Sequence, residues 1–327
     1  LAKATLLASG GLGQIFLHTT NPPVATGDGL AMAYRAGARI INAEYVQFHP
    51  TTFYHQGQAH FLITEALRGE GARLLNYQGQ PFMHRYDPEW GDLAPRDVVA
   101  RSIHLEMLRT NAPHVYLDIS SVMPAQKIIE RFPTIYHKCL EYDVDPTREP
   151  IPVVPAAHYF CGGVWVDAWG RTNLERLYAA GEVSCTGVHG ANRLGSASLL
   201  EGLVWGLRAA KDMLRRLPDF SSPDPRTIPQ WEEEGVTETA DPALVKHDMA
   251  TIKHTMWYYV GLVRSRKRLE RALRDLSNLQ QDIDAFYRTT RLDPDILSLR
   301  NAALAANIVA RAAWENRESH GCHYREN

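Results

Sequence analysis

A glycine-rich loop between a short strand and a long helix constrains the fold of this chain more than any other segment. The sequence LYAAGEVSCTGVHGANRLGSASLLEGLVWG, Leu177–Gly206, predicts a strand that ends at Gly181 and Glu182, a loop with further glycines, and a helix that begins at Ser196 or Ser198. Loop glycines let a ligand approach the backbone, and a helix N-terminus favours an anionic or electron-rich group. A solvent-exposed loop with a satisfied helix cap fits the same pattern, so both interpretations stay open here.

Three polar side chains of this segment suit ligand binding. Glu182, at the end of the strand, is placed to accept hydrogen bonds from ribityl or ribose hydroxyls. His189 and Arg193 lie in the loop itself. Such a pair suits a carboxylate, because a guanidinium binds it through two parallel hydrogen bonds.

A second glycine cluster lies near the start of the chain, in LASGGLGQIF. Gly11 and Gly13 resemble the opening of a dinucleotide fingerprint, but Phe16 stands where the third glycine belongs. Pro22 and Pro23 also prevent a helix from following directly. We therefore predict a tight glycine turn after a strand. The chain opens almost at once on that strand and has no initiator methionine, so we expect that an N-terminal portion is missing.

The next part of the chain mixes helix and strand patterns. Residues 1–43 predict a strand, a glycine turn, a loop and a helix that begins near Asp28, whose carboxylate can cap it. Residues 44–157 contain shorter elements. Among them we expect a helix over Asp97–Leu108, a strand over His114–Ser120 and helical turns from Pro124 to Tyr142.

The C-terminal half changes character after the Leu177–Gly206 segment. Before this segment, GGVWVDAWGRT predicts a hairpin through Ala168–Gly170. After it, the prolines between Pro218 and Pro229 indicate a linker. The pattern of Asp241–Glu315 is almost all helical, with interruptions near Gly261 and Asp293–Pro294. We expect a helical bundle with a charged outer face there.

Composition excludes several classes of protein. A chain of 327 residues with 45% hydrophobic and 22% charged residues is typical of a globular protein with two or three domains. The net charge of -2 and the lack of a lysine or arginine tract argue against nucleic-acid binding. The four cysteines form no CxxC pair, so we expect neither a zinc site nor a disulfide framework. The expected compartment is a reducing cytoplasm. No apolar run has the length of a membrane span.

Further candidate residues lie in short motifs, each weak by itself. His49 lies in YVQFHPTTFY, before a proline and among aromatic residues; alone, it is more typical of a hydrogen-bonded structural histidine. Thr64, Glu65 and Arg68 lie in FLITEALRGEGARLL, where Glu65 and Arg68 are spaced to pair on one helical turn. An ordinary surface ion pair explains that spacing equally well.

Two more motifs complete the set. In LAPRDVVAR, Asp97 caps or begins a helix and Arg96 lies just outside it, which also fits a plain charged helix start. In VVPAAHYFCGGVWVD, His158 precedes the predicted hairpin. No Ser/His/Asp triad, metal-ligand helix or P-loop is evident in the sequence.

The motifs together resemble one family. In chain order they are GDGLAMAYRAGA, QFHPT, ITEALRGEGA, APRDVVAR, EPIPVVPAAHYFCGGVWVD, the Leu177–Gly206 segment and RESHGCHYRE. This series resembles the succinate dehydrogenase/fumarate reductase flavoprotein family over essentially the whole chain. The resemblance implies an α/β fold, α+β overall: the later part of a Rossmann-like FAD domain with an inserted capping domain and a C-terminal helical bundle. The run LASGGLGQIF then belongs near the flavin, and the ADP-binding fingerprint precedes these residues.

The resemblance also implies domain boundaries and roles for single residues. It implies an FAD-binding domain over 1–43 and 158–225, a capping domain over 44–157 and a helical domain over 226–327. The residues that match FAD contacts are Asp28, Glu182, Ser198 and Leu199, the last two at the helix N-terminus under the isoalloxazine ring. Those that match the positions holding two substrate carboxylates are His49, Thr64, His158 and Arg193.

Catalysis is implied for a third group of residues. Arg96 matches a proton shuttle, with Glu65 and Arg68 as relay partners. Because a guanidinium with a pKa above about 12 is a poor acid or base, this role requires a neighbouring carboxylate, for which Glu65 is the natural candidate.

Two segments favour one branch of the family. PAAHYFCGGV and ENRESHGCHYREN are most similar to the flavoenzymes that oxidise L-aspartate to iminoaspartate, the first step of NAD (pyridine nucleotide) biosynthesis by the quinolinate route. The implied acceptor is oxygen or fumarate, and quinolinate synthase is a further implied partner. We expect a cytoplasmic monomer or weak oligomer, without nucleic-acid or membrane partners.

Two other interpretations remain open on the sequence. One is a succinate dehydrogenase or fumarate reductase flavoprotein subunit, which docks an iron–sulfur partner. The other is a non-catalytic binding or scaffold fragment. Because the nucleotide fingerprint is absent from these residues, we expect the isolated chain to hold FAD poorly and to be catalytically incomplete.

Overall fold

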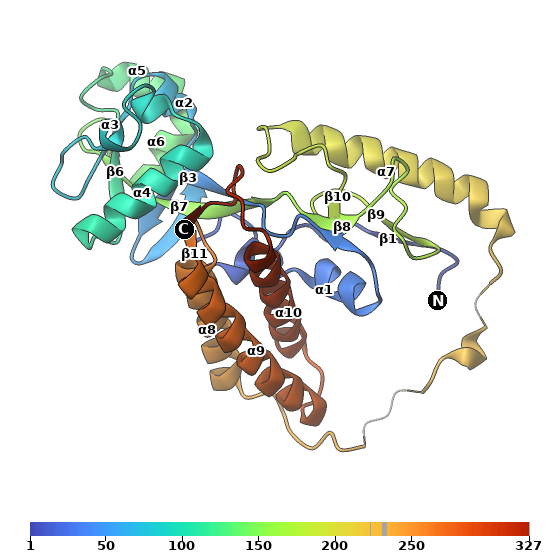
Figure 1. Ribbon diagram of the computed structural model, residues 1–327. Helices are drawn as coiled ribbons and strands as arrows, with labels where there is room; N and C mark the ends of the chain where they lie inside the picture. The colour runs from blue at the N-terminus through green and yellow to red at the C-terminus, as the bar shows by residue number, and fades with distance from the viewer. Residues whose placement is uncertain (223, 231–233, 327) are drawn as a thin grey trace. The chain divides into compact units, whose positions relative to one another are not determined.

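The computed structural model describes residues 1–222, 224–230 and 234–326, which combine helices and sheets as the α/β prediction requires (Figure 1). The chain divides into two compact units. The first contains residues Leu1–Leu17, Asn21–Gln47 and Tyr159–Asn327, and the second contains His18–Thr20 and Phe48–His158. Whether these units correspond to FAD-binding, capping and helical domains with the expected boundaries stays a prediction.

Short strands from distant parts of the chain form the sheets of the first unit. Strand β1 (Thr5–Leu7) pairs in parallel with β9 (Leu177–Ala179), so the start of the chain lies beside the glycine-loop segment. Strand β8 (Gly163–Trp165) lies between β2 (Ile40–Ile41), which is antiparallel to it, and β10 (Ser184–Cys185), which is parallel. The chain turns at Ala168–Gly170 as predicted, with Asp167 N donating to the Arg171 carbonyl oxygen at 3.0 Å. The hairpin pairing is wrong, because both neighbours of β8 come from elsewhere.

The first glycine cluster forms a turn, as predicted. After β1 the backbone enters a single 3-10 turn, η1 (Gly13–Ile15), and no helix follows directly. Gly11 lies against Glu182, where an added Cβ would approach Oε1 to 2.2 Å. Glycine is needed there for this close approach of the backbone to a carboxylate.

The capping role predicted for Asp28 is wrong in detail. Helix α1 (Asp28–Arg35) begins with Asp28 itself, and its N-cap is Gly27, which has a φ of 84°. The carboxylate of Asp28 instead accepts hydrogen bonds from Thr26 Oγ1 at 2.7 Å and Asn301 Nδ2 at 2.6 Å. These partners compete with the backbone N–H groups for the same oxygens.

Helix α7 (Ala197–Arg216) is fixed on the first unit through one buried carboxylate. Asp212 accepts hydrogen bonds from Tyr178 at 2.9 Å, from Arg171 Nε at 2.6 Å and from Arg215 at 2.9 Å. These bonds, that of Arg171 foremost, hold the pKa of Asp212 well below its ordinary value. Two 3-10 turns, η3 (Leu217–Asp219) and η4 (Pro225–Thr227), follow α7 in the predicted linker.

Three helices close the first unit, and the helices predicted over Asp241–Glu315 are confirmed. They are α8 (Pro242–Tyr259), α9 (Arg266–Thr289) and α10 (Pro294–Glu315), which pack on one another. Each has an N-cap side chain that accepts a backbone hydrogen bond: Asp241, Ser265 and Asp293. Proline at the first helical position of α8 and α10 fits the same rule. The short strands β11 (Arg264–Ser265) and β12 (Arg325–Glu326) pair in parallel.

The second unit contains a five-stranded sheet in the order β4-β3-β7-β6-β5. Its strands are β3 (Val46–His55), β4 (Gln58–Leu62), β5 (Arg73–Leu75), β6 (Val115–Asp118) and β7 (Ile151–Phe160). The pairs β3–β4, β5–β6 and β6–β7 are antiparallel. Alternate residues of β6 are buried, as expected of a strand with one face on a core.

Helices of the second unit follow the sequence patterns. They are α2 (Ala66–Gly69), α3 (Met83–Tyr86), α4 (Arg96–Thr110), α5 (Ala125–Arg131) and α6 (Pro133–Leu140), with a 3-10 turn, η2, at Gly91–Leu93. The helical turns predicted around Pro133 form two helices, because Pro133 starts the second and disfavours a helical conformation at Phe132.

Candidate active site

Two guanidinium groups and one carboxylate form a network in the second unit. Arg96, the first residue of α4, donates to Glu65 through Nε at 2.6 Å and through Nη2 at 2.9 Å. Arg68 donates to the same carboxylate at 3.3 Å and to the carbonyl oxygen of Asp92 at 2.7 Å. The pairing of Glu65 with Arg68 is as predicted, and so is the proximity of Glu65 to Arg96, which lies some thirty residues further along the chain.

The network places a carboxylate where it can exchange a proton with an arginine. Arg68 is buried, and this burial lowers the pKa of its guanidinium. Glu65 remains one-third exposed, so it stays within reach of a ligand or solvent. The Nη1 atom of Arg96 is buried without a hydrogen-bond partner among the described residues. Asp97 lies in the first turn of α4 and accepts a hydrogen bond from Arg101 at 2.9 Å rather than capping the helix. Arg96, predicted just outside the helix, is its first residue.

Two histidines lie side by side in the same unit. The rings of His49, on β3, and His158, on β7, have centroids 5.4 Å apart and meet edge to face. His158 Nδ1 also lies 2.8 Å from Thr20 Oγ1. Burial, together with the positive charges of His158, Arg96 and Arg68, holds the pKa of His49 well below its ordinary value. His49 is therefore a neutral imidazole that can donate one hydrogen bond.

Thr64 has a partly local role. It precedes α2, and its hydroxyl accepts a hydrogen bond from Ala66 N at 3.3 Å. The side chain is neither fully buried nor fully exposed. Its hydroxyl hydrogen is still free to bond another acceptor.

A buried carboxylate organises the glycine loop of the first unit. Glu201, on α7, lies 2.7 Å from His189 Nε2 and accepts hydrogen bonds from Tyr159 Oη at 3.1 Å and from Thr186 Oγ1. Burial raises the pKa of Glu201, but the hydrogen bonds from His189 and Thr186 outweigh burial and leave the pKa below its ordinary value. Burial also raises the pKa of Tyr159. The carboxylate is therefore ionised and the phenol neutral near pH 7.

Arg193 lies over the ring of Tyr159. Its guanidinium carbon is 4.3 Å from the ring centroid, and Nη2 donates to Ser198 Oγ at 2.7 Å. Gln47 fixes the loop, because its Nε2 donates to the Arg193 carbonyl oxygen at 2.7 Å. The predicted pair of His189 and Arg193 is replaced by two separate contacts, since His189 binds Glu201 while Arg193 stacks on Tyr159. The buried Nε of Arg193 has no hydrogen-bond partner in the described part of the chain.

The residues around Glu182 fit a cofactor with hydroxyl groups. One oxygen of Glu182 accepts a hydrogen bond from Phe160 N at 2.9 Å, and burial raises the pKa of this carboxyl. The Glu182 carboxylate lies so close to Gly11 that a side chain at position 11 would collide with it. A half-buried carboxylate with this one backbone donor has capacity for further hydrogen bonds, of the kind that a ribityl or ribose hydroxyl would supply.

The N-terminus of α7 is similarly open. Its N-cap, Ser196, has a φ of 68°, and in this described segment no side chain caps the helix. Ser198 is half-buried and binds Arg193, whereas Leu199 is exposed. Ala197 N and Leu199 N donate to the Leu194 and Ser196 carbonyl oxygens at 3.3 Å. The positive end of the helix dipole here suits an electron-rich ring edge.

Sequence reasoning missed three residues of this arrangement. The Arg193 loop is positioned by Gln47, Tyr159 and Glu201. In the sequence, each of them looks like an ordinary residue of a strand or helix. The alternation of β7 gives a partial indication, because His158 and Tyr159 point to opposite faces of one strand. Glu201 lies among apolar residues near the start of α7, and a glutamate in such a place is a second indication of a buried, bonded carboxylate.

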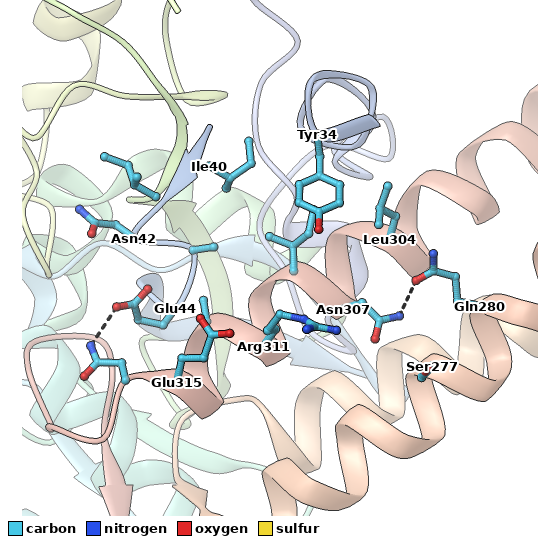
Figure 2. Close-up of a pocket in the computed structure, with 15 residues that line it drawn as sticks. Tyr34, Ile40, Asn42, Glu44, Ser277, Gln280, Leu304, Asn307, Arg311 and Glu315 are labelled. Atoms are coloured by element: carbon cyan, nitrogen blue, oxygen red, sulfur yellow. Dashed lines mark hydrogen bonds between the residues drawn. The ribbon is translucent and has the colours of Figure 1, made fainter. Parts of the chain in front are cut away.

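A separate cavity of about 620 Å³ lies in the first unit between α1, β2, α9 and α10. Figure 2 shows Tyr34, Glu44 and Arg311 at its wall, with dashed bonds joining Glu44 to Asn316 and Gln280 to Asn307. None of the predicted site residues lines it. Among the described residues, no cluster of histidine, cysteine or acidic side chains could hold a metal ion. No described helix has the length and apolar character that a membrane crossing requires.

Family models match both ends of the chain. The FAD binding domain family matches residues 1–199, and the fumarate reductase flavoprotein C-terminal family matches residues 249–327. The chain is 50% identical, over 99% of its length, to the L-aspartate oxidases of Yersinia pestis and Pseudomonas aeruginosa. It covers 60% and 59% of those proteins, and 53% of the chloroplastic L-aspartate oxidase of rice, to which it is 42% identical. The chain thus spans about three-fifths of the bacterial relatives.

Solved structures give a consistent result. A quinol fumarate reductase from Escherichia coli aligns with a TM-score of 0.88 at 30% identity, over 99% of this chain and 60% of that one. Mycobacterium smegmatis Sdh1 in complex with UQ1 aligns with a TM-score of 0.83 at 35% identity, over 99% and 56%. The mixed helix-and-sheet fold of the flavoprotein family is therefore confirmed.

Loss of the Glu201 charge should destabilise the first unit in a pH-dependent manner. Because its pKa is lowered on folding, Glu201 contributes stability above its ordinary pKa of 4.5, and this contribution is lost as the pH falls below that value. We expect Glu201→Gln to lower the free energy of unfolding by about 1–3 kcal/mol at pH 7, and by progressively less as the pH falls below 4.5 and through the lowered pKa of the folded protein. Urea titrations across that range measure it. Glu175→Gln, whose side chain is 72% exposed, is the matched control and should change little. A pH-independent loss at Glu201 would contradict the assignment.

Proposed function

We propose, from the premise that this chain belongs to the FAD binding domain family, that it is part of an FAD-dependent oxidoreductase that oxidises L-aspartate to iminoaspartate. The observation that carries the proposal is 50% identity to L-aspartate oxidases across 99% of the chain. The geometry supports it, because the chain contains both a stacked, partly unpaired arginine and a carboxylate–guanidinium network.

The cofactor-binding residues are proposed from the glycine loop and its surroundings. Glu182 would bind sugar or ribityl hydroxyls, and Ser198 and Leu199 would bring the open end of α7 to the ring. Asp28 would support this region indirectly, since its oxygens already bind Thr26 and Asn301. When bound, FAD supplies a two-electron acceptor for a hydride.

Substrate binding is assigned to groups that can hold carboxylates. Arg193 offers an unused buried Nε beside a guanidinium already oriented by Ser198, so a carboxylate can bind it through two hydrogen bonds. His49 and His158 would each donate one hydrogen bond, and Thr64 a third through its hydroxyl. A neutral His49 binds a carboxylate as a donor without adding a titrating charge near pH 7.

Proton movement is assigned to the Glu65 network. Arg96 would exchange the substrate proton, and Glu65 would receive it from the guanidinium through their bidentate hydrogen bonds. Arg68 would orient the Glu65 carboxylate through its own hydrogen bond at 3.3 Å. Arg96 can act in this way only because a carboxylate lies 2.6 Å from its Nε.

The remaining assignments concern partners. Oxygen or fumarate would accept the electrons, and an enzyme that consumes the reactive imine, such as quinolinate synthase, would follow in NAD biosynthesis. A cytoplasmic location and a monomer or weak oligomer complete the proposal. A second candidate is a succinate dehydrogenase or fumarate reductase flavoprotein subunit, which the TM-scores of 0.83 and 0.88 favour. Its sequence support is weaker, at 30–35% identity.

A chimaera tests the reaction directly. In it, this chain replaces the matching part of the Yersinia pestis L-aspartate oxidase, to which it is 50% identical. We expect the chimaera to bind FAD, seen as flavin absorbance, and to release hydrogen peroxide with L-aspartate at least about tenfold faster than with succinate. A flavin-containing chimaera that prefers succinate would support the dehydrogenase or fumarate reductase candidate instead.

The carboxylate-binding role of Arg193 predicts a loss in the same chimaera. Arg193→Lys should lower kcat/KM for L-aspartate about ten- to a hundredfold, because an ammonium cannot reproduce a bidentate hydrogen bond of about 1.5–3 kcal/mol. Steady-state peroxide release measures the effect. Arg226→Lys, whose side chain is 90% exposed, is the control and should leave kcat/KM unchanged. Equal efficiencies for the two variants would reject the role of Arg193.

The proton-transfer role of Arg96 predicts a variant that keeps its cofactor. Arg96→Leu should retain flavin absorbance but lose its anaerobic bleaching by L-aspartate, and Glu65→Gln should slow the bleaching partially. Arg131→Leu, an exposed residue of the same unit that pairs with Glu70, is the control. If Arg96 were only a charged helix-start residue, its loss would cost about 1 kcal/mol of stability or less and bleaching would persist at the parental rate.

A further inference from the structure

Two of the four cysteines lie against each other beside the glycine loop. Cys161 is the residue that follows β7, and Cys322 lies in the C-terminal segment after α10. Both belong to the first unit, and the Cys322 thiol donates a hydrogen bond to the Cys161 sulfur. All four cysteines of the chain are thiols in the structure. The pair is therefore reduced, with its two sulfur atoms already in contact.

Backbone hydrogen bonds fix Cys322 on the glycine loop. Its N–H donates to the Ala191 carbonyl oxygen at 2.9 Å, and its Sγ lies 3.3 Å from Asn192 Oδ1. The residue lies in a tight turn, in which His320 and His323 exchange backbone hydrogen bonds of 2.8 and 3.0 Å. The position of the Cys322 sulfur is thus set by the backbone on both sides of it.

Cys161 is fixed in a similar way and has an acidic thiol. Its N–H donates to the Tyr45 carbonyl oxygen at 2.9 Å, and its sulfur accepts a hydrogen bond from the Arg193 backbone N–H. The hydrogen bond from Cys322 lowers the pKa of the Cys161 thiol most, and the backbone N–H and positive charge of Arg193 lower it further, against burial, which raises it. A lowered pKa favours the thiolate, which is the nucleophilic form of a cysteine.

The other two cysteines have neither property. Cys139, on α6, is fully buried, and burial raises the pKa of its thiol to about 12. Burial also raises the pKa of Cys185, on β10, whose sulfur donates to the Cys161 carbonyl oxygen at 3.7 Å. All four thiols are buried, so access does not separate them. Cys161 differs in its acidity and in having a second thiol beside its sulfur.

We propose that Cys161 and Cys322 form a modification site at which hydrogen peroxide converts the two thiols into a disulfide. Peroxide suits a buried site because it is a small, uncharged oxidant. The Cys161 thiolate attacks one peroxide oxygen, the O–O bond breaks, and the hydroxide that leaves takes up a proton to give water. The product at Cys161 is a sulfenic acid.

The second thiol then resolves the sulfenic acid. The Cys322 sulfur attacks the Cys161 sulfur, the S–S bond forms, and the S–O bond breaks. The oxygen leaves as a second water with the thiol proton of Cys322. The two thiols have then lost two electrons, and one peroxide has been reduced to two waters.

The disulfide would act on the loop that carries Arg193. It removes the Cys161 thiolate that accepts the Arg193 backbone N–H, and it joins the C-terminal segment covalently to the end of β7. Asn192 would lose its contact with a thiol but keep its hydrogen bond from Gln47 Nε2 at 2.6 Å. The proposed reaction with oxygen releases peroxide, yet the thiol chemistry does not require that activity.

Peptide mapping of the full chain tests the site without any measurement of activity. The reduced chain of 327 residues is treated with a small molar excess of hydrogen peroxide, the remaining thiols are alkylated, and the protein is digested without a reductant. We expect one cross-linked peptide pair, Cys161 with Cys322, to form at least about tenfold faster than Cys139 or Cys185 is oxidised. Dithiothreitol should restore all four thiols. In urea, where the fold is lost, the tenfold preference should disappear.

Single variants separate the two steps. In Cys322→Ser the resolving thiol is absent, so a sulfenic acid should accumulate at Cys161, measured by labelling with dimedone. Cys161→Ser should abolish the cross-link. Cys139→Ser is the matched control, because its buried thiol belongs to the second unit, and it should leave the rate of cross-linking unchanged.

Several results would overturn the proposal. They are the lack of a cross-link between Cys161 and Cys322, equal oxidation rates of the four thiols in the folded chain, disulfides between chains at a comparable rate, or a cross-link that forms equally fast in urea. A chimaera that prefers succinate to L-aspartate would contradict the proposed function and leave this site standing, because the peroxide in the mapping experiment is added from outside.

Discussion

The buried carboxylate of Glu201 is the interaction on which the arrangement of the glycine loop depends. A carboxylate taken out of water must be hydrogen-bonded, and Glu201 meets this requirement with His189, Tyr159 and Thr186. Those three partners come from β7 and from two points of the loop, so one charge ties a strand, a loop and a helix together. Arg193 then stacks on the ring of Tyr159, which the same charge has oriented.

The second unit handles its charges differently. Glu65 remains one-third exposed and binds Arg96 in a bidentate geometry, with Arg68 buried behind it. A buried carboxylate such as Glu201 with all bonds filled is suited to holding structure, whereas an accessible one beside two guanidiniums is suited to exchanging protons. Burial and solvent access thus separate a positioning carboxylate from a candidate catalytic one, although both are glutamates near arginines or histidines.

Local patterns in the sequence predicted the elements, and long-range contacts decided the site. The helices of Asp241–Glu315 follow from apolar spacing and from capping residues such as Asp293, which act within a few residues. The turn at Ala168–Gly170 was predicted correctly, but its hairpin pairing was wrong, because β8 takes its partners from residues over a hundred positions away and from the glycine loop. The resemblance supplied Arg96 and Arg193, but neither spacing nor composition could reveal that Tyr159 lies under one of them.

Part of the unfilled hydrogen-bonding capacity among the described residues lies on side chains with proposed roles. Arg96 Nη1 and Arg193 Nε are buried donors and have no hydrogen-bond partner within the described residues. A buried donor left unpaired costs about 1–3 kcal/mol, so a fold retains it only where other bonds fix the side chain in place. Glu65 does so for Arg96 and Ser198 for Arg193. Each side chain is thus held rigidly by one partner while another donor stays open. The proposed binding of a carboxylate substrate would use this preorganisation.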